Sequence, residues 1–131
     1  MEPLNKKENN LIQGIDTIIV RVSNIQKSKT WYQDKLGFLP IWQDADMKLV
    51  VFDTKGAASL TIWQTDKKIE NQRETATYPI FKTTDASKLR EDLQNQGIQV
   101  EQIMEDDHVK YFFFFDPDGN VLEACEVFDL R

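Results

Sequence analysis

Short β-branched runs alternate along this chain with segments whose apolar residues recur at helical spacing. Residues 15–22 predict a strand, and its alternation places Thr17 and Arg21 on the same face. Residues 25–36 predict a helix, because their apolar positions recur every three or four residues and Gly37 suits a helix end. Three further strands are predicted at residues 39–43, 48–53 and 59–64.

The same order of elements returns in the second half of the chain. Residues 65–77 are polar and predict a linker without a helix or strand of its own. Residues 78–83 then predict a strand. Leu89 and Leu93 lie one turn apart on a predicted helix that ends near Gly97. Three closing strands are predicted at residues 98–103, 110–115 and 121–128.

This repeat indicates an internal duplication. When the two halves are superposed, Thr17 falls opposite Tyr78, and Thr61 falls opposite Glu123. We therefore predict an α+β fold in which two tandem βαβββ modules form a curved mixed sheet around a concave pocket. The predicted organisation is a flexible N-terminal tail at residues 1–10 and a single domain at 11–131, with module one at 15–64, the linker at 65–77 and module two at 78–128.

Composition narrows the class of protein. Of the 131 residues, 40% are hydrophobic and 29% are charged, which is typical of a soluble globular protein, and no apolar run is long enough to span a membrane. The net charge of -6 and the scattered lysines argue against nucleic-acid binding. A single cysteine, Cys125, and a polar N-terminus without a signal-peptide core predict a cytoplasmic location.

Three conspicuous features receive a structural explanation. Residues 116–120, Asp-Pro-Asp-Gly-Asn, predict a tight turn between two strands, and we assign this turn no chemistry. His108, the single histidine, is expected in an exposed loop. Cys125 is expected to be a small buried apolar residue, because no histidine is placed to act as its base.

Several short motifs occur in an order that is typical of one superfamily. They are Ile15-Asp16-Thr17, residues 20–24, Trp31-Tyr32, Leu36-Gly37-Phe38, residues 114–120 and Leu122-Glu123. With these motifs, the chain resembles the vicinal oxygen chelate superfamily over nearly its whole length. That superfamily includes glyoxalase I, the extradiol dioxygenases, the fosfomycin-resistance enzymes and the bleomycin-resistance proteins. The resemblance implies the same fold of paired modules.

The resemblance also implies four metal-ligand positions on the concave face, taken from the first and fourth strands of the two modules. In this chain they are Thr17, Thr61, Tyr78 and Glu123. Glu123 alone is a strong ligand, because divalent metals prefer imidazole, carboxylate or thiolate to hydroxyl or phenol oxygens. We therefore expect no metal site of the family type and no cofactor. A divalent metal belongs only to the alternative function given below.

The expected concave face combines aromatic and apolar side chains with a few polar groups, as small-molecule sites do. Trp63 and Tyr78 are suited to stack on a planar ligand or hold a cation, and Glu123 is suited to a positive group. Structural alternatives stay open. Packing or a dimer contact would explain Trp63, and an ion pair with Arg21 or Lys82 would explain Glu123. The predicted ligand-binding residues are Thr17, Arg21, Thr61, Trp63, Tyr78 and Glu123.

Two functions follow. The first is metal-free binding of a small organic molecule, for sequestration, resistance or sensing, by a homodimer similar to the bleomycin-resistance branch. The expected ligand is cationic or aromatic. The alternative is a lyase, dioxygenase or transferase of the same superfamily, with an atypical metal site or with Glu123 as general base. Whether the protein is an enzyme is left open by the sequence, and its metal content discriminates between the two functions.

Overall fold

The structure, a computed structural model, describes residues 11–128 and confirms the predicted α+β fold of two tandem modules. Residues 1–10, predicted as a flexible tail, lie outside the described residues, as do residues 129–131. Module one consists of β1 (Thr17–Val22), α1 (Ile25–Leu36), β2 (Leu39–Asp44), β3 (Leu49–Asp53) and β4 (Ser59–Gln64). Module two consists of β5 (Ile80–Lys82), α2 (Ala86–Asn95), β6 (Met104–Glu105), β7 (Val109–Phe115) and β8 (Val121–Val127).

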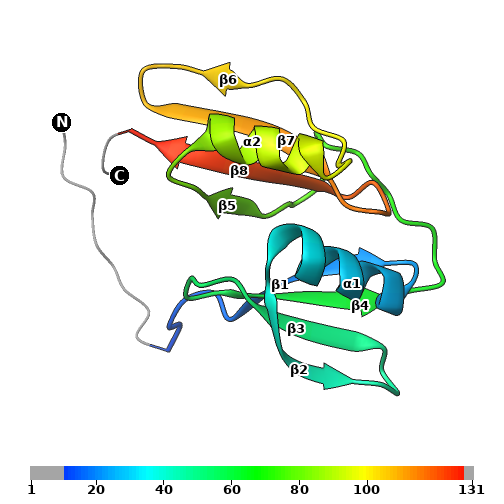
Figure 1. Cartoon of the computed structure of the whole chain (residues 1–131). Coiled ribbons are helices and arrows are strands. Elements are labelled where there is room, and N and C mark those ends of the chain that lie inside the picture. Colours follow the sequence, from blue (N-terminus) through cyan, green and yellow to red (C-terminus); the bar gives the residue numbers. More distant parts are fainter. Residues whose placement is uncertain (1–10, 129–131) are drawn as a thin grey trace.

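Within residues 11–128, each module forms a mixed four-stranded sheet with one helix on its face (Figure 1). The strand orders are β1-β4-β3-β2 and β5-β8-β7-β6, so the first and last strands of each module pair in parallel. Figure 1 shows the two sheets one above the other, with β1 and β5 at the edges that face each other. No helix in the described part of the chain is long and apolar enough to cross a membrane.

The strand registers reproduce the internal repeat residue by residue. In module one, Ile19 is the partner of Thr61, and in module two, Ile80 is the partner of Glu123. Thr61 and Glu123 are therefore equivalent positions of the two sheets. The superposition of the two halves of the sequence predicts this equivalence correctly.

A polar side chain caps the beginning of each helix. The Asn24 side chain accepts a hydrogen bond from the Lys27 N–H, and the Asp85 side chain accepts one from the Lys88 N–H, each at 3.0 Å. Gly37 ends α1 with a φ of 72°, a left-handed conformation that glycine adopts at low cost. Local sequence signals thus determine where the helices begin and where α1 ends.

The core of each module lies between its helix and its sheet. Alternate strand residues face the helix, and Val22 of β1, Phe52 of β3 and Phe112 of β7 have no exposed surface. Tyr32 of α1 is also fully buried. The remaining strand residues point to the other side of each sheet. We call this side, which the helix does not cover, the open face.

The predicted strand at residues 98–103 is wrong. Val100 makes only a single bridge to β7, and β6 forms later, at Met104–Glu105. The Arg90 side chain of α2 donates to the Glu101 carbonyl at 2.7 Å. The Glu101 N–H still donates to the Phe113 carbonyl of β7 at 2.8 Å, but the Glu101 carbonyl bonds to a side chain of α2, and pairing in this segment is limited to one bridge.

Three other strands begin later than predicted, and the first of them, β1, begins at Thr17 instead of residue 15. β5 begins at Ile80 instead of residue 78, because Pro79 has no N–H to donate to a neighbouring strand. β3 begins at Leu49, since Lys48 has a φ of 56° and cannot continue an extended strand. The predicted linker at residues 65–77 does lack helices and strands.

The β7–β8 turn joins the two modules as well as the two strands. The Tyr32 hydroxyl of α1 donates to Asp116 Oδ2 at 2.8 Å, and both residues are buried. Asn120 Nδ2 donates to the Arg21 carbonyl of β1 at 2.8 Å. The predicted turn therefore forms, and its polar groups hold module two against module one. We call Tyr32, Asp116 and Asn120 the intermodule clasp.

Candidate functional site

The two hydroxyl positions predicted in module one lie side by side on its open face. Thr17 is in β1, and Thr61 is in the adjacent parallel strand β4. Their Oγ1 atoms lie 2.7 Å apart and share a hydrogen bond, and Thr61 is only 4% exposed. The two hydroxyls therefore satisfy one another within the sheet.

Arg21 and Trp63 also form a pair, further along β1 and β4. The Arg21 guanidinium lies 4.5 Å from the centre of the Trp63 ring, a cation–π contact. It donates to the backbone carbonyls of Trp63 and Gln64, each at 3.1 Å. The Trp63 indole N–H donates to the Met47 carbonyl at 3.0 Å. Module one itself thus holds both side chains, which agrees with the packing alternative for Trp63.

Glu123 lies in the middle of β8 on the open face of module two, and it is 8% exposed. Its side chain makes no hydrogen bond or ion pair with any residue from 11 to 128, and neither Arg21 nor Lys82 reaches it. The ion pair that would have explained Glu123 structurally is therefore absent among these residues. Burial raises the pKa of the Glu123 carboxyl above its ordinary value.

The carboxylate of Glu123 still reaches solvent. No fully buried side-chain nitrogen or oxygen in the described residues lacks a hydrogen-bond partner. Because the Glu123 oxygens have no partner, they must retain some accessible surface. A small group that approaches along the open face can therefore contact the carboxylate.

One aromatic ring lies directly beside Glu123, and two more rings contact that ring. Phe113 is the direct partner of Glu123 on β7 and shares its face of the sheet. The rings of Tyr78 and Tyr111 both meet the Phe113 ring edge to face, with ring centres 5.8 Å and 5.9 Å apart. Strand β8 lies between β5 and β7. Tyr78 precedes β5 and Phe113 belongs to β7, so the contact between their rings spans β8. We call Tyr78, Tyr111 and Phe113 the aromatic arch.

Sequence reasoning identifies Tyr78 but misses Tyr111 and Phe113. The signal that identifies them is the alternation along β7, which places residues 111 and 113 on the side opposite the buried Phe112. Sequence reasoning also misses Arg73, which lies in the linker. The Arg73 guanidinium lies 4.5 Å from the centre of the Phe113 ring and forms an ion pair with Glu101.

The predicted site residues thus form three groups. Thr17 contacts Thr61, Arg21 contacts Trp63, and Tyr78 lies with Glu123 in module two. Among residues 11–128, no hydrogen bond, ion pair or ring contact joins either module-one pair to the module-two group. The structure therefore does not bring all six predicted residues into contact with one another.

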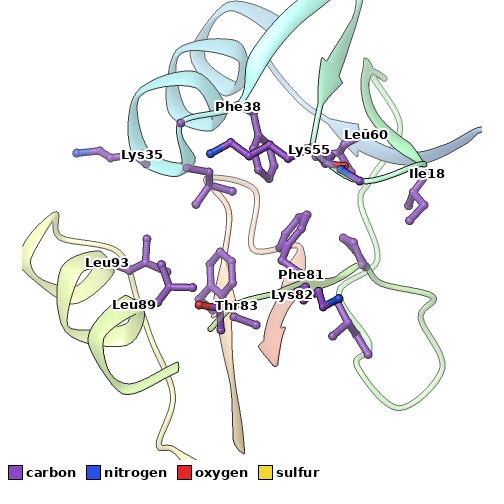
Figure 2. A pocket seen from close by; sticks show the side chains of 18 of the residues that line it. Ile18, Lys35, Phe38, Lys55, Leu60, Phe81, Lys82, Thr83, Leu89 and Leu93 are labelled. Carbon is purple, nitrogen blue, oxygen red and sulfur yellow. The ribbon is translucent and has the colours of Figure 1, made fainter. Parts of the chain in front are cut away.

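A cavity of about 1210 Å³ lies elsewhere, between the two modules on the side of the helices (Figure 2). In Figure 2 Phe38 of module one and Phe81 of module two extend toward each other, and their ring centres are 5.2 Å apart. The lysines that line it are Lys35, Lys55 and Lys82. None of the six predicted site residues lines this cavity, although Arg21 borders a smaller one of about 360 Å³ beneath the linker.

The positions that correspond to metal ligands do not offer a suitable donor set for a divalent ion. Thr17 and Thr61 bond to each other, Tyr78 contributes a phenol, and Glu123 alone is a carboxylate. Catalytic zinc sites normally take three imidazole, thiolate or carboxylate ligands from protein. In the part of the chain that the structure describes, no three histidine, cysteine, aspartate or glutamate side chains are grouped to hold a metal. His108 lies exposed in the turn before β7, as expected.

Comparisons with known proteins agree with this fold. The chain is 25% identical over 118 residues to the uncharacterized protein YraH of Bacillus subtilis (strain 168), covering 81% of this chain and 92% of YraH. It is 28% identical to a glyoxalase family protein from Enterococcus faecalis, whose crystal structure superposes with a TM-score of 0.73 over 88% of this chain and 99% of that chain. TnmS3, an antibiotic binding protein from Streptomyces sp. CB03234, is 20% identical with a TM-score of 0.72, over 91% and 99%.

The family comparison is more specific than these pairwise similarities. A family model described as the Glyoxalase/Bleomycin resistance protein/Dioxygenase superfamily matches residues 14–124. This range contains both modules up to β8, including all six predicted site residues. The match therefore depends on the whole duplicated fold, and the chain belongs to the Glyoxalase/Bleomycin resistance protein/Dioxygenase superfamily.

Proposed function

We propose that this protein binds a small organic molecule on the open face of module two, without a divalent metal. One observation carries the proposal. Glu123 is a buried carboxylate that has no partner among the described residues, and it lies beside aromatic rings. Leaving a buried charge unpaired costs free energy, and such departures from good packing are expected at functional sites. A ligand that pairs with the carboxylate offsets this cost.

The similarity to TnmS3 supports ligand binding as a function that this fold can have. That protein is named for antibiotic binding, and it shares the fold at low sequence identity. For the present chain, sequestration, resistance and sensing all require the same property, a ligand site on the protein surface. The aromatic arch supplies apolar contact area, and Glu123 supplies a fixed polar group, which together are the usual elements of such a site.

A second candidate function is catalysis with Glu123 as general base. Burial raises the pKa of Glu123, as is common for catalytic carboxylates. Under this alternative, Glu123→Gln lowers turnover at least about 100-fold and leaves ligand affinity nearly unchanged. Under the binding function, the same substitution weakens affinity, and no turnover is measurable in either protein.

We further propose that the protein acts as a cytoplasmic homodimer. Strand β2, the outer strand of module one, exposes several apolar side chains that a second copy would cover. Leu39, Ile41 and Trp42 are 63%, 56% and 56% exposed. Sedimentation velocity over a range of concentrations is expected to show a dimer. Only a monomer at the highest concentration would contradict this part of the proposal.

A thermal-shift screen of metabolites and antibiotics on chelator-treated protein tests the binding function. Wild type is compared with Glu123→Gln and with Glu91→Gln, which removes the same charge from the exposed face of α2. A true ligand is expected to raise the melting temperature of wild type and of Glu91→Gln, but not of Glu123→Gln. A ligand that stabilises all three proteins equally, or only after metal is added, would contradict the proposal.

A further inference from the structure

The charge of the ligand follows from the surroundings of Glu123. We infer that the site binds an organic cation, an ammonium or amidinium compound, whose charged group lies against the Glu123 carboxylate and the rings of the aromatic arch. This inference rests on the proposed function, because it assigns a chemical class to the ligand of that same site. Three observations carry it. The Glu123 carboxylate has no partner among the described residues, the nearby cations do not pair with it, and a neighbouring aromatic ring already holds a cation.

The carboxylate has room for a positive partner that the described residues do not provide. Lys82 lies on β5, two residues beyond the partner of Glu123, and forms no ion pair with any residue from 11 to 128. Lys110 on β7 is 3.7 Å from Glu105 instead, and Arg73 is paired with Glu101. Lys82 instead lines the cavity between the modules, while Lys110 and Arg73 are paired with other acids. None of these three cations is paired with Glu123.

One ring of the aromatic arch already holds a cation at its face. An aromatic ring attracts positive charge at its face, because its π-electrons make that face negative. The Phe113 ring already accepts a guanidinium in this structure, since Arg73 lies 4.5 Å from its centre. Arg73 and its partner Glu101 are about two-fifths exposed, at 43% and 39%. A contact that is this exposed is weak, so a ligand can displace Arg73 from the ring.

The other ligand classes fit the same surroundings less well. An organic anion would be repelled by Glu123 at a short distance in a poorly hydrated site. A neutral aromatic molecule would stack on the arch and displace the water that remains around the Glu123 carboxylate. The carboxylate would then have neither water nor a charged partner, which costs free energy. A cation forms both the ion pair and the contact with the rings, so charge is expected to be the main determinant of affinity.

Three probes of nearly equal size separate these classes: benzylamine, benzyl alcohol and benzoate, which are cationic, neutral and anionic at neutral pH. Ligand-observed NMR titrations give the affinity of each probe for wild type, Glu123→Gln and Glu91→Gln. Wild type and Glu91→Gln are expected to bind benzylamine about tenfold or more tightly than benzyl alcohol, and benzoate more weakly still. Glu123→Gln is expected to abolish the preference for benzylamine while retaining its affinity for benzyl alcohol.

The outcomes distinguish this inference from the proposed function. If benzyl alcohol or benzoate binds wild type as tightly as benzylamine, or if benzylamine does not bind up to its solubility, the inference is wrong. In that case a neutral or anionic compound from the thermal-shift screen that requires Glu123 would still support the proposed function. A preference for benzylamine that persists in Glu123→Gln also overturns the inference, because the selecting charge then lies elsewhere.

Discussion

Replacing Glu123 by glutamine is predicted to stabilise the protein at neutral pH while impairing its site. The carboxylate is 8% exposed and has no partner among the described residues. A fully buried polar group without a hydrogen bond costs about 1–3 kcal/mol, and a charged one costs more. Because the Glu123 oxygens keep some contact with water, only part of this cost applies here. Glutamine has nearly the same shape and removes the charge, but it keeps polar atoms that also prefer water. We therefore expect the free energy of unfolding to rise by about 1 kcal/mol.

The predicted gain depends on pH in a defined direction. Burial raises the pKa of Glu123 in the folded state above its ordinary value of 4.5. Between these two pKa values, the folded state binds more protons at this site than the unfolded state does. The contribution of Glu123 to the free energy of unfolding therefore falls as pH rises through this window. Below the window the carboxyl is neutral in both states, and the difference between Glu123→Gln and wild type should disappear.

Urea unfolding of wild type, Glu123→Gln and Glu91→Gln measures both effects. At neutral pH, a gain of about 1 kcal/mol corresponds to a midpoint increase of roughly 0.5 M urea for a domain of this size. Glu91→Gln should unfold like wild type, since Glu91 is exposed on α2. The reasoning is refuted if Glu123→Gln is less stable than wild type at neutral pH. That result would mean that the carboxylate has a stabilising partner, such as a subunit or a bound ion.

The remaining predictions concern stability within the fold. Tyr32→Phe should lower the free energy of unfolding by about 1–2 kcal/mol, because it removes a buried hydrogen bond to Asp116. The Tyr111 hydroxyl bonds to no described residue, so Tyr111→Phe should change the free energy of unfolding by less than about 0.5 kcal/mol. Equal effects of the two substitutions in urea unfolding would contradict a stabilising role for the Tyr32–Asp116 hydrogen bond. Thr17→Val and Thr61→Val should each cost about 1 kcal/mol, and the double variant should cost clearly less than the sum, because each single change leaves the other hydroxyl unpaired. Additive effects in the double-mutant cycle would contradict the shared hydrogen bond.

The sequence predicts helices and strands well where a short run of residues determines them. The predicted strand at residues 59–64 matches the bounds of β4, and the predicted helix at residues 25–36 matches the bounds of α1. It fails at residues 98–103, where the apolar pattern is present but a side chain of α2 bonds to the backbone. That contact depends on tertiary structure and leaves no periodic trace in the sequence.

The candidate site, too, can be predicted from the sequence only in part. The resemblance to the superfamily identifies Glu123 as a candidate, and the internal repeat correctly matches it to Thr61 of module one. The contact between Tyr78 and Phe113 depends on strand order, since β8 comes last in the chain but lies between β5 and β7. The position of Arg73 depends on the path of the linker, which has no regular pattern. Contacts of this kind require a structure.

Calorimetric titration of chelator-treated protein with zinc, nickel or manganese tests the central claim most directly. The donors at Thr17, Thr61, Tyr78 and Glu123 are predicted to give no saturable one-to-one binding with any of the three ions. Binding of one equivalent of metal to wild type, lost in Glu123→Gln and retained in Glu91→Gln, would contradict the account. It would show that Glu123 holds a metal and not an organic ligand.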